Sequence, residues 1–168
     1  MELLRHQMES GNFLSLSQSV EQAFLLERIK KQHREILHKI LPEIDMHFSA
    51  VIEQGNSFFS EIMPAFEAFC RFSELLKDHI YMEENIVFPK LALEEKPNIA
   101  AIRDFILNHD DFEAMIQELL CDVRLTLEPL LELLPFRILL LKMEHLQLLL
   151  SEHNTLEELL FSDFLFEE

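Results

Sequence analysis

The sequence predicts an all-α protein that folds as an up-down-up-down four-helix bundle. The chain has only 2 glycines in 168 residues, and 49% of its residues are hydrophobic. These hydrophobic residues recur every three or four positions over long stretches, which places them on one face of a helix. The stretches are joined by short connections, so consecutive helices are expected to lie antiparallel.

The first helix is expected to run from about Ser19 to Gln54. Its apolar stripe follows the helical period and consists of Leu26, Ile29, His33, Ile36, Ile40, Ile44 and Val51. Pro42 is expected to bend this helix, because proline disturbs the regular hydrogen bonding of a helix interior. Gly55, followed by Asn56 and Ser57, predicts the stop and the turn.

The second helix is expected to begin between Ser57 and Pro64, and Pro89 limits at least its regular portion. Its inward face is predicted to carry Phe69, Phe72, Leu76, His79, Glu83 and Ile86. A turn is expected over residues 94–98, where Pro97 lies. A third helix follows, and the side chains in register on it are Ile102, Phe105, His109, Phe112, Ile116 and Leu120.

The last helix follows a junction bracketed by Pro129 and Pro135. Its predicted stripe consists of Leu139, Met143, Leu146, Leu150, His153, Glu157 and Leu160. A chain of this length suits one domain, so the bundle is expected to occupy residues 17–168. Residues 1–16 are expected to form an N-terminal arm or a short extra helix.

Composition excludes several classes of partner. The formal net charge is −17, which disfavours nucleic acid and anionic membrane surfaces, because both attract clustered lysine and arginine. The N-terminal residues lack the apolar core of a signal peptide, and charges interrupt the Leu-rich tract over residues 125–150. Cys70 and Cys121 show no thiolate-metal spacing. A reduced, cytoplasmic setting is expected.

The pattern His-x-x-x-Glu occurs twice on these stripes, at His79 to Glu83 and at His153 to Glu157. Residues four apart on a helix point the same way, so each pair offers an imidazole and a carboxylate to a common point. One such match is weak in a chain this acidic, and an isolated histidine on an apolar face is more often a core group. Here His33 and His109 occupy the other two stripes, and a bundle brings all four faces to one axis.

The sequence therefore predicts a site for two metal ions inside the bundle. Burying these groups without a metal would cost several kcal/mol in desolvation. Imidazole with carboxylate suits iron, manganese or zinc rather than copper(I) or an iron-sulfur cluster. The predicted ligands are His33, His79, Glu83, His109, His153 and Glu157. Glu113, four residues after His109, is either an extra ligand or an acid just outside the site. The remaining histidines, His6, His38, His47 and His145, are expected to be surface or structural residues, and no role is expected for Tyr81.

The segment from His79 to Pro89, HIYMEENIVFP, resembles the signature of hemerythrin-like, HHE cation-binding domains. The order of the six predicted ligands is similar to that in the di-iron domain of repair-of-iron-centres proteins, which act in iron-sulfur cluster repair. The resemblance implies a four-helix bundle that holds two iron ions, bridged by Glu83, Glu157 and an oxo or hydroxo group. The four histidines would then be terminal ligands.

The resemblance implies a role in the nitrosative and oxidative stress response, through repair of damaged iron-sulfur centres or reaction with nitric oxide. The adjacent-cysteine module of those relatives has no counterpart in this sequence, so a thiol-dependent step is not implied. The alternatives are a di-iron O2 or NO sensor, an iron-handling module without catalysis, and a metal-free helical interaction protein. Expected partners are a small diatomic ligand and damaged iron-sulfur proteins. The sequence decides neither enzymatic activity nor oligomeric state.

Overall fold

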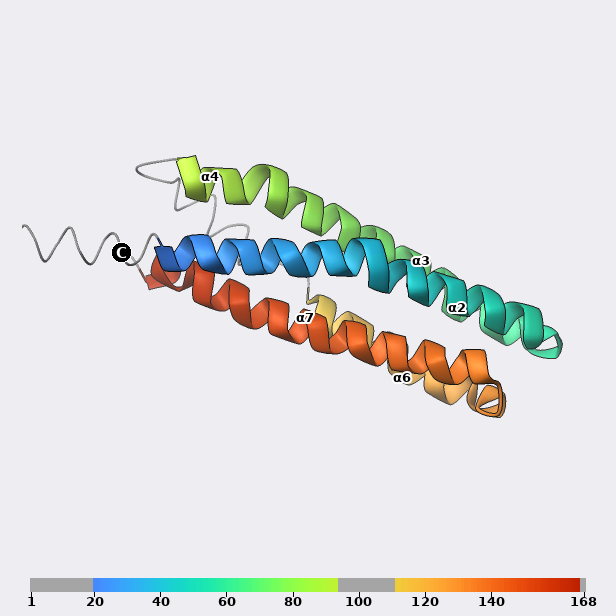
Figure 1. Ribbon diagram of the computed structural model, residues 1–168. Coiled ribbons are helices and arrows are strands. Elements are labelled where there is room, and N and C mark those ends of the chain that lie inside the picture. The colour runs from blue at the N-terminus through green and yellow to red at the C-terminus, as the bar shows by residue number, and fades with distance from the viewer. Residues whose placement is uncertain (1–19, 94–110, 167–168) are drawn as a thin grey trace, which may run out of the picture.

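A computed structural model gives the structure of the chain. It describes residues 20–93 and 111–166, with side chains placed over 20–91 and 111–162. Within these ranges all regular structure is helical, and four helical rods lie alongside one another (Figure 1). The predicted all-α bundle is confirmed. None of the helices in these ranges has the length and apolar character needed to cross a membrane. The predicted arm, residues 1–16, lies outside the described residues.

The first rod is α-helical over residues 20–35, continues as the π-helix η1 (Ile36–Ile40) and ends as α2 (Leu41–Gln54). The rod runs through Pro42, which occupies the first turn of α2, where a missing N–H is tolerated. A wide π-turn lies just before Pro42, in which the Leu41 N–H donates to the Ile36 carbonyl. The bend expected at Pro42 stays a prediction. The predicted start near Ser19 lies outside the described residues.

The second rod follows the turn at Gly55, as predicted. It consists of η2 (Asn56–Phe58), α3 (Phe59–Met82), the π-helix η3 (Glu83–Val87) and α4 (Phe88–Leu93). Gly55 suits a tight turn, because a Cβ there would lie 2.8 Å from the Val51 carbonyl oxygen. α3 ends at Met82, before Pro89, but the rod continues, since Pro89 falls in the first turn of α4.

The prediction that Ile86 faces the core is wrong. Ile86 is 38% exposed, whereas Val87 and Phe88 are buried. In a regular α-helix Ile86 would point almost the same way as His79, and Phe88 would point about 180° away. The π-helix η3 holds one residue more than α geometry needs, which turns the following side chains back by about one position. Val87 therefore takes the direction expected of Ile86, and Phe88 is turned from the opposite face toward the interior.

The third rod is described from α6 (Phe112–Thr126), which η4 (Glu128–Leu130) and a turn join to α7 (Leu134–Phe166). A continuous helix across Phe105 and Phe112 is a wrong prediction, because Asp111 has non-helical backbone angles. Its carboxylate accepts a hydrogen bond from the Ala114 N–H, which makes Asp111 the N-cap of α6.

The interior has two apolar clusters, and most of the predicted stripes of all four rods lie in them. The larger fills the middle of the bundle and the end where both turns lie (Figure 1). The smaller lies toward the opposite end and consists of Ile29, Val87, Phe88, Leu156, Leu160 and Phe161. Between them, three rods contribute buried histidine and glutamate: His33 lies between Ile29 and Ile36 in sequence, and His153 follows Leu150. A polar layer thus separates two apolar clusters.

Candidate metal centre

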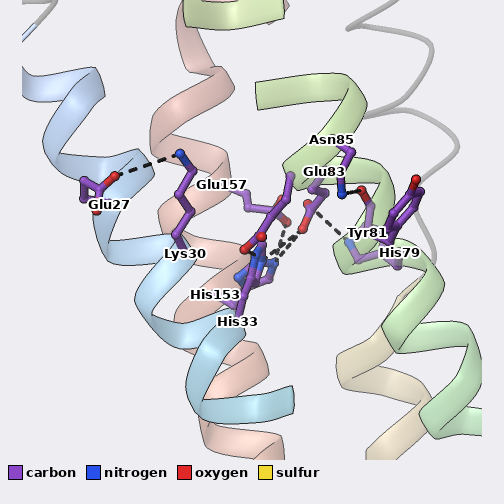
Figure 2. Close-up of polar contacts among 10 residues, drawn as sticks. Glu27, Lys30, His33, His79, Tyr81, Glu83, Asn85, His153 and Glu157 are labelled. Atoms are coloured by element: carbon purple, nitrogen blue, oxygen red, sulfur yellow. Dashed lines mark hydrogen bonds and ion pairs between the residues drawn. The ribbon is translucent and has the colours of Figure 1, made fainter. Parts of the chain in front are cut away.

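Five of the six predicted ligands meet in this polar layer. His33 comes from the first rod, His79 and Glu83 from the end of α3 and the start of η3, and His153 with Glu157 from α7. Their side chains are almost fully withdrawn from solvent, with the Glu83 carboxylate and the His33 ring at 0% exposure. Figure 2 shows them converging from three helices on one point. Helical spacing places each His-x-x-x-Glu pair on one face, as predicted.

The Glu83 carboxylate lies at the centre of this group. Its Oε1 is 3.2 Å from Nε2 of His79. Its Oε2 faces the other way and is 3.1 Å from Nε2 of His33 and 3.8 Å from Nε2 of His153. The two oxygens of one carboxylate therefore face histidines of different helices, an orientation suited to a carboxylate that bridges two cations.

The second carboxylate, Glu157, lies beside His153. Its Oε2 is 3.4 Å from Nε2 of His153. One ligand atom from each of His79, Glu83, His153 and Glu157 can be chosen so that all four lie within 4.8 Å of one another. The His33 and His153 rings also lie close, with centroids 5.0 Å apart.

These separations fit coordination of a metal. With metal–ligand bonds of about 2.0–2.2 Å, two ligand atoms on the same ion lie about 3.0–3.5 Å apart. Three of the four nitrogen–oxygen distances, 3.1, 3.2 and 3.4 Å, fall in this interval. The donor set of imidazole nitrogens and carboxylate oxygens suits iron, manganese or zinc. The residues present therefore fit a cation, and only small shifts would bring them to bonding geometry.

His33 is held on three sides by the second rod. Beyond the Glu83 contact, its Nδ1 lies 2.9 Å from Oε1 of Glu84. The Phe88 ring stacks on the His33 ring, with a centroid distance of 5.9 Å and an interplanar angle of 5°. Glu84 is not among the predicted ligands, because in a regular α-helix it would point about 140° away from His79.

The other candidates lie apart from this group or outside the described residues. His109 lies outside the described residues. The regular helical spacing that placed His109 on the same face as Phe112 does not hold across Asp111. Glu113 is not part of the His/Glu cluster. Its carboxylate accepts a hydrogen bond at 3.4 Å from the amide of Asn154, the residue that follows His153. His38 is exposed and His145 half-buried. Tyr81 is 63% exposed, and Figure 2 shows its ring pointing away from the layer.

The sequence matches the family of the hemerythrin HHE cation-binding domain over residues 24–165. Comparison with curated proteins gave no match, and comparison with solved structures gave none either. The family match spans all four rods and every residue of the polar layer, and the buried His/Glu cluster within it could hold a metal. The chain therefore belongs to the hemerythrin HHE cation-binding domain family.

Proposed function

We propose that the protein is a cytoplasmic non-haem di-iron protein of the nitrosative and oxidative stress response, which repairs damaged iron-sulfur centres or reacts with nitric oxide. The observation that carries the metal part is the convergence of three imidazole nitrogens on the two oxygens of Glu83. The order of the ligands along the chain, similar to that of repair-of-iron-centres proteins, supports the stress-response part.

Two cations rather than one are supported by how the ligands divide. Oε1 of Glu83 faces His79, while Oε2 faces His33 and His153. One ion would therefore be held on the His79 side and one on the side of His33 and His153. Glu157 lies beside His153 and offers the second bridge, and His109 remains the proposed sixth ligand. Few protein ligands per ion leave coordination positions for a small molecule.

When bound, an iron pair supplies one-electron redox chemistry and positions where a small ligand can bind. The chain's own residues position the ions and exclude bulk water. The burial of the layer favours a small species over a group that projects from another protein's surface. A role in repair would therefore pass through a diffusible species, such as nitric oxide or an iron ion.

A thiol-dependent step receives no support from the cysteines of this chain. Cys70 is half-buried and Cys121 exposed, and both are free thiols. Burial, and then the nearby Asp45 carboxylate, raise the pKa of the Cys70 thiol, which lowers its thiolate fraction near neutral pH.

Metal analysis of protein produced in iron-replete medium tests the centre. We expect about two irons per chain, with near-ultraviolet absorption from oxygen-to-iron charge transfer. A colourless protein that retains little metal would contradict the proposal and leave a metal-free helical protein.

Repair and sensing are separated by a functional assay. The reduced, iron-loaded protein is added to an iron-sulfur enzyme that has been inactivated with nitric oxide, and recovery of the enzyme's activity is followed. Recovery supports repair. No recovery, together with reversible binding of NO or O2, would instead establish a sensor or binding module.

A further inference from the structure

Both ring nitrogens of His33 are engaged by consecutive residues of the second rod. Oε2 of Glu83 lies 3.1 Å from Nε2, and Oε1 of Glu84 lies 2.9 Å from Nδ1. An ionised carboxylate can only accept hydrogen bonds, so a neutral His33 ring can donate to Glu84 from Nδ1 or to Glu83 from Nε2, but not to both. A cation in the layer needs the lone pair of Nε2, the nitrogen that faces the cluster, and this places the proton on Nδ1, where Glu84 accepts it.

Adjacent residues of an α-helix point about 100° apart. Glu83 and Glu84 lie at the start of η3, and their long side chains reach the two nitrogens of the His33 ring from neighbouring positions. Phe88, directly after η3, stacks on the face of the His33 ring. Three groups in η3 or directly after it therefore surround His33: an acceptor on each nitrogen and a ring on one face.

We propose that Glu84 is a positioning residue that fixes the Nδ1–H tautomer and the orientation of His33, so that Nε2 is presented to a cation. This inference rests on the proposed metal centre and deepens it, since it makes the two cation positions unequal. The cation on the side of His33 and His153 would depend on Glu84, and the cation on the side of His79 would not.

A carboxylate that orients a metal-ligating histidine typically contributes a factor of about 10 to 100 in metal affinity. The Glu84 side chain is 36% exposed, so solvent partly replaces its hydrogen bond and the lower end of this range applies. We expect Glu84→Ala to weaken one of two Co²⁺-binding steps about tenfold. Glu84→Gln, whose amide oxygen can still accept from Nδ1–H, should recover part of the loss.

Glu113→Ala is the matched control. Glu113 is also a half-buried acid close to the layer, but its carboxylate accepts from Asn154 rather than from a histidine of the layer. Titration of metal-free protein with Co²⁺, followed by visible absorption, gives the affinity of each step for the wild type and the three variants. Equal losses in Glu84→Ala and Glu113→Ala would overturn the inference, because they would report only a change in charge near the layer. Unchanged affinities in Glu84→Ala would overturn it too.

A second readout does not need the metal. The nitrogen-15 chemical shifts of the His33 ring report its tautomer in the metal-free protein. We expect the Nδ1–H tautomer to predominate in the wild type, because the Glu84 contact is the shorter of the two, and the Nε2–H tautomer to gain in Glu84→Ala, where Glu83 is the acceptor that remains. Thermal unfolding confirms that the variant is folded. The same tautomer in both proteins would overturn the inference even if metal binding changed. If the wild type binds no Co²⁺ or iron, the proposed metal centre fails, and the tautomer comparison still decides the role of Glu84.

Discussion

The large apolar cluster and the polar layer occupy neighbouring levels of the same bundle, but burial has opposite effects on the folding free energy in the two. In the cluster, Phe48 packs against Phe66 and Phe69 with ring centroids 5.4 Å apart, and burial of such side chains stabilises the fold directly. In the layer, His33 and Glu83 are just as completely buried, although burial of polar groups opposes folding unless partners compensate. The apolar cluster therefore holds the bundle together, and the polar layer is the level suited to chemistry.

This contrast predicts that the two levels respond differently to metal. Truncation in the apolar cluster should destabilise the protein equally with and without a cation. Changes in the polar layer should matter mainly when a cation is bound, because only a cation makes full use of those ligands.

Phe48→Ala should have the largest effect. Phe48 is fully buried among aromatic rings, so its removal leaves a cavity and should lower the free energy of unfolding by about 3–5 kcal/mol. Chemical denaturation, with and without metal, measures this loss. A loss that differed strongly between the two conditions would contradict this prediction, because it would mean that the apolar cluster is coupled to metal binding.

His153→Ala should remove most metal binding, and with it the stability that metal adds. A cation at 100 times its dissociation constant stabilises the wild type by about 2.7 kcal/mol, and the variant should lose most of this increment. Thermal unfolding with and without metal measures it. His145→Ala, eight residues earlier on α7, is the control and should keep both the metal and the increment. If His145→Ala strips the metal as fully as His153→Ala, the ligand assignment is wrong.

Asp111→Ala tests the edge of the third rod. Asp111 caps α6 by accepting a hydrogen bond from the Ala114 N–H at 2.9 Å. Loss of such a cap costs about 1 kcal/mol. Denaturant unfolding should show this loss to the same extent with and without metal. Asp111→Asn is the matched control and should keep most of the stability, since asparagine also caps well. A loss confined to the metal-loaded protein would mean that the start of α6 belongs to the metal centre.

The smallest expected effect concerns an ion pair at the surface of the bundle. The Lys142 ammonium lies 2.6 Å from Oε2 of Glu43, and this hydrogen bond lowers the pKa of the Glu43 carboxyl. A lowered folded-state pKa means that the contribution is present above the unfolded pKa and is lost as the pH falls through the folded value. Both side chains are partly exposed, so the pair should contribute no more than about 0.5 kcal/mol.

Lys142→Met should therefore lower stability near neutral pH and become indistinguishable from the wild type in acid, once Glu43 is protonated in both. Unfolding free energies at several pH values measure the difference. A difference that grew as the pH fell would contradict the assigned sign.

The apolar periodicity predicted most of the fold, because each stripe averages over many residues. On α7, every side chain assigned to the stripe from Leu139 to Leu160 is buried. Two features escaped this reasoning. The cap at Asp111 could have been found, since an aspartate just before an apolar run is a helix-start signal. The wide turn at η3 could not, because a rule based on the regular helical period assigns every residue to a fixed face.

The candidate site divides in the same way. The i to i+4 spacing correctly paired His79 with Glu83 and His153 with Glu157, since regular helix suffices to bring each pair together. Glu84 was missed because it contacts a histidine that lies 51 positions away in sequence. Contacts between distant segments are not encoded in the period of either helix.

The surplus residue in η3 also determines where this rod could change length. Deletion of one residue between Glu84 and Val87 would let the wide turn relax into ordinary α-helix. The side chains on both sides of the deletion would still point in their present directions. The same deletion within α3 would rotate everything beyond it by about 100° and would carry the motif away from the partner helices. The stretch beside the motif is therefore the place where the second rod can lose a residue without losing its alignment.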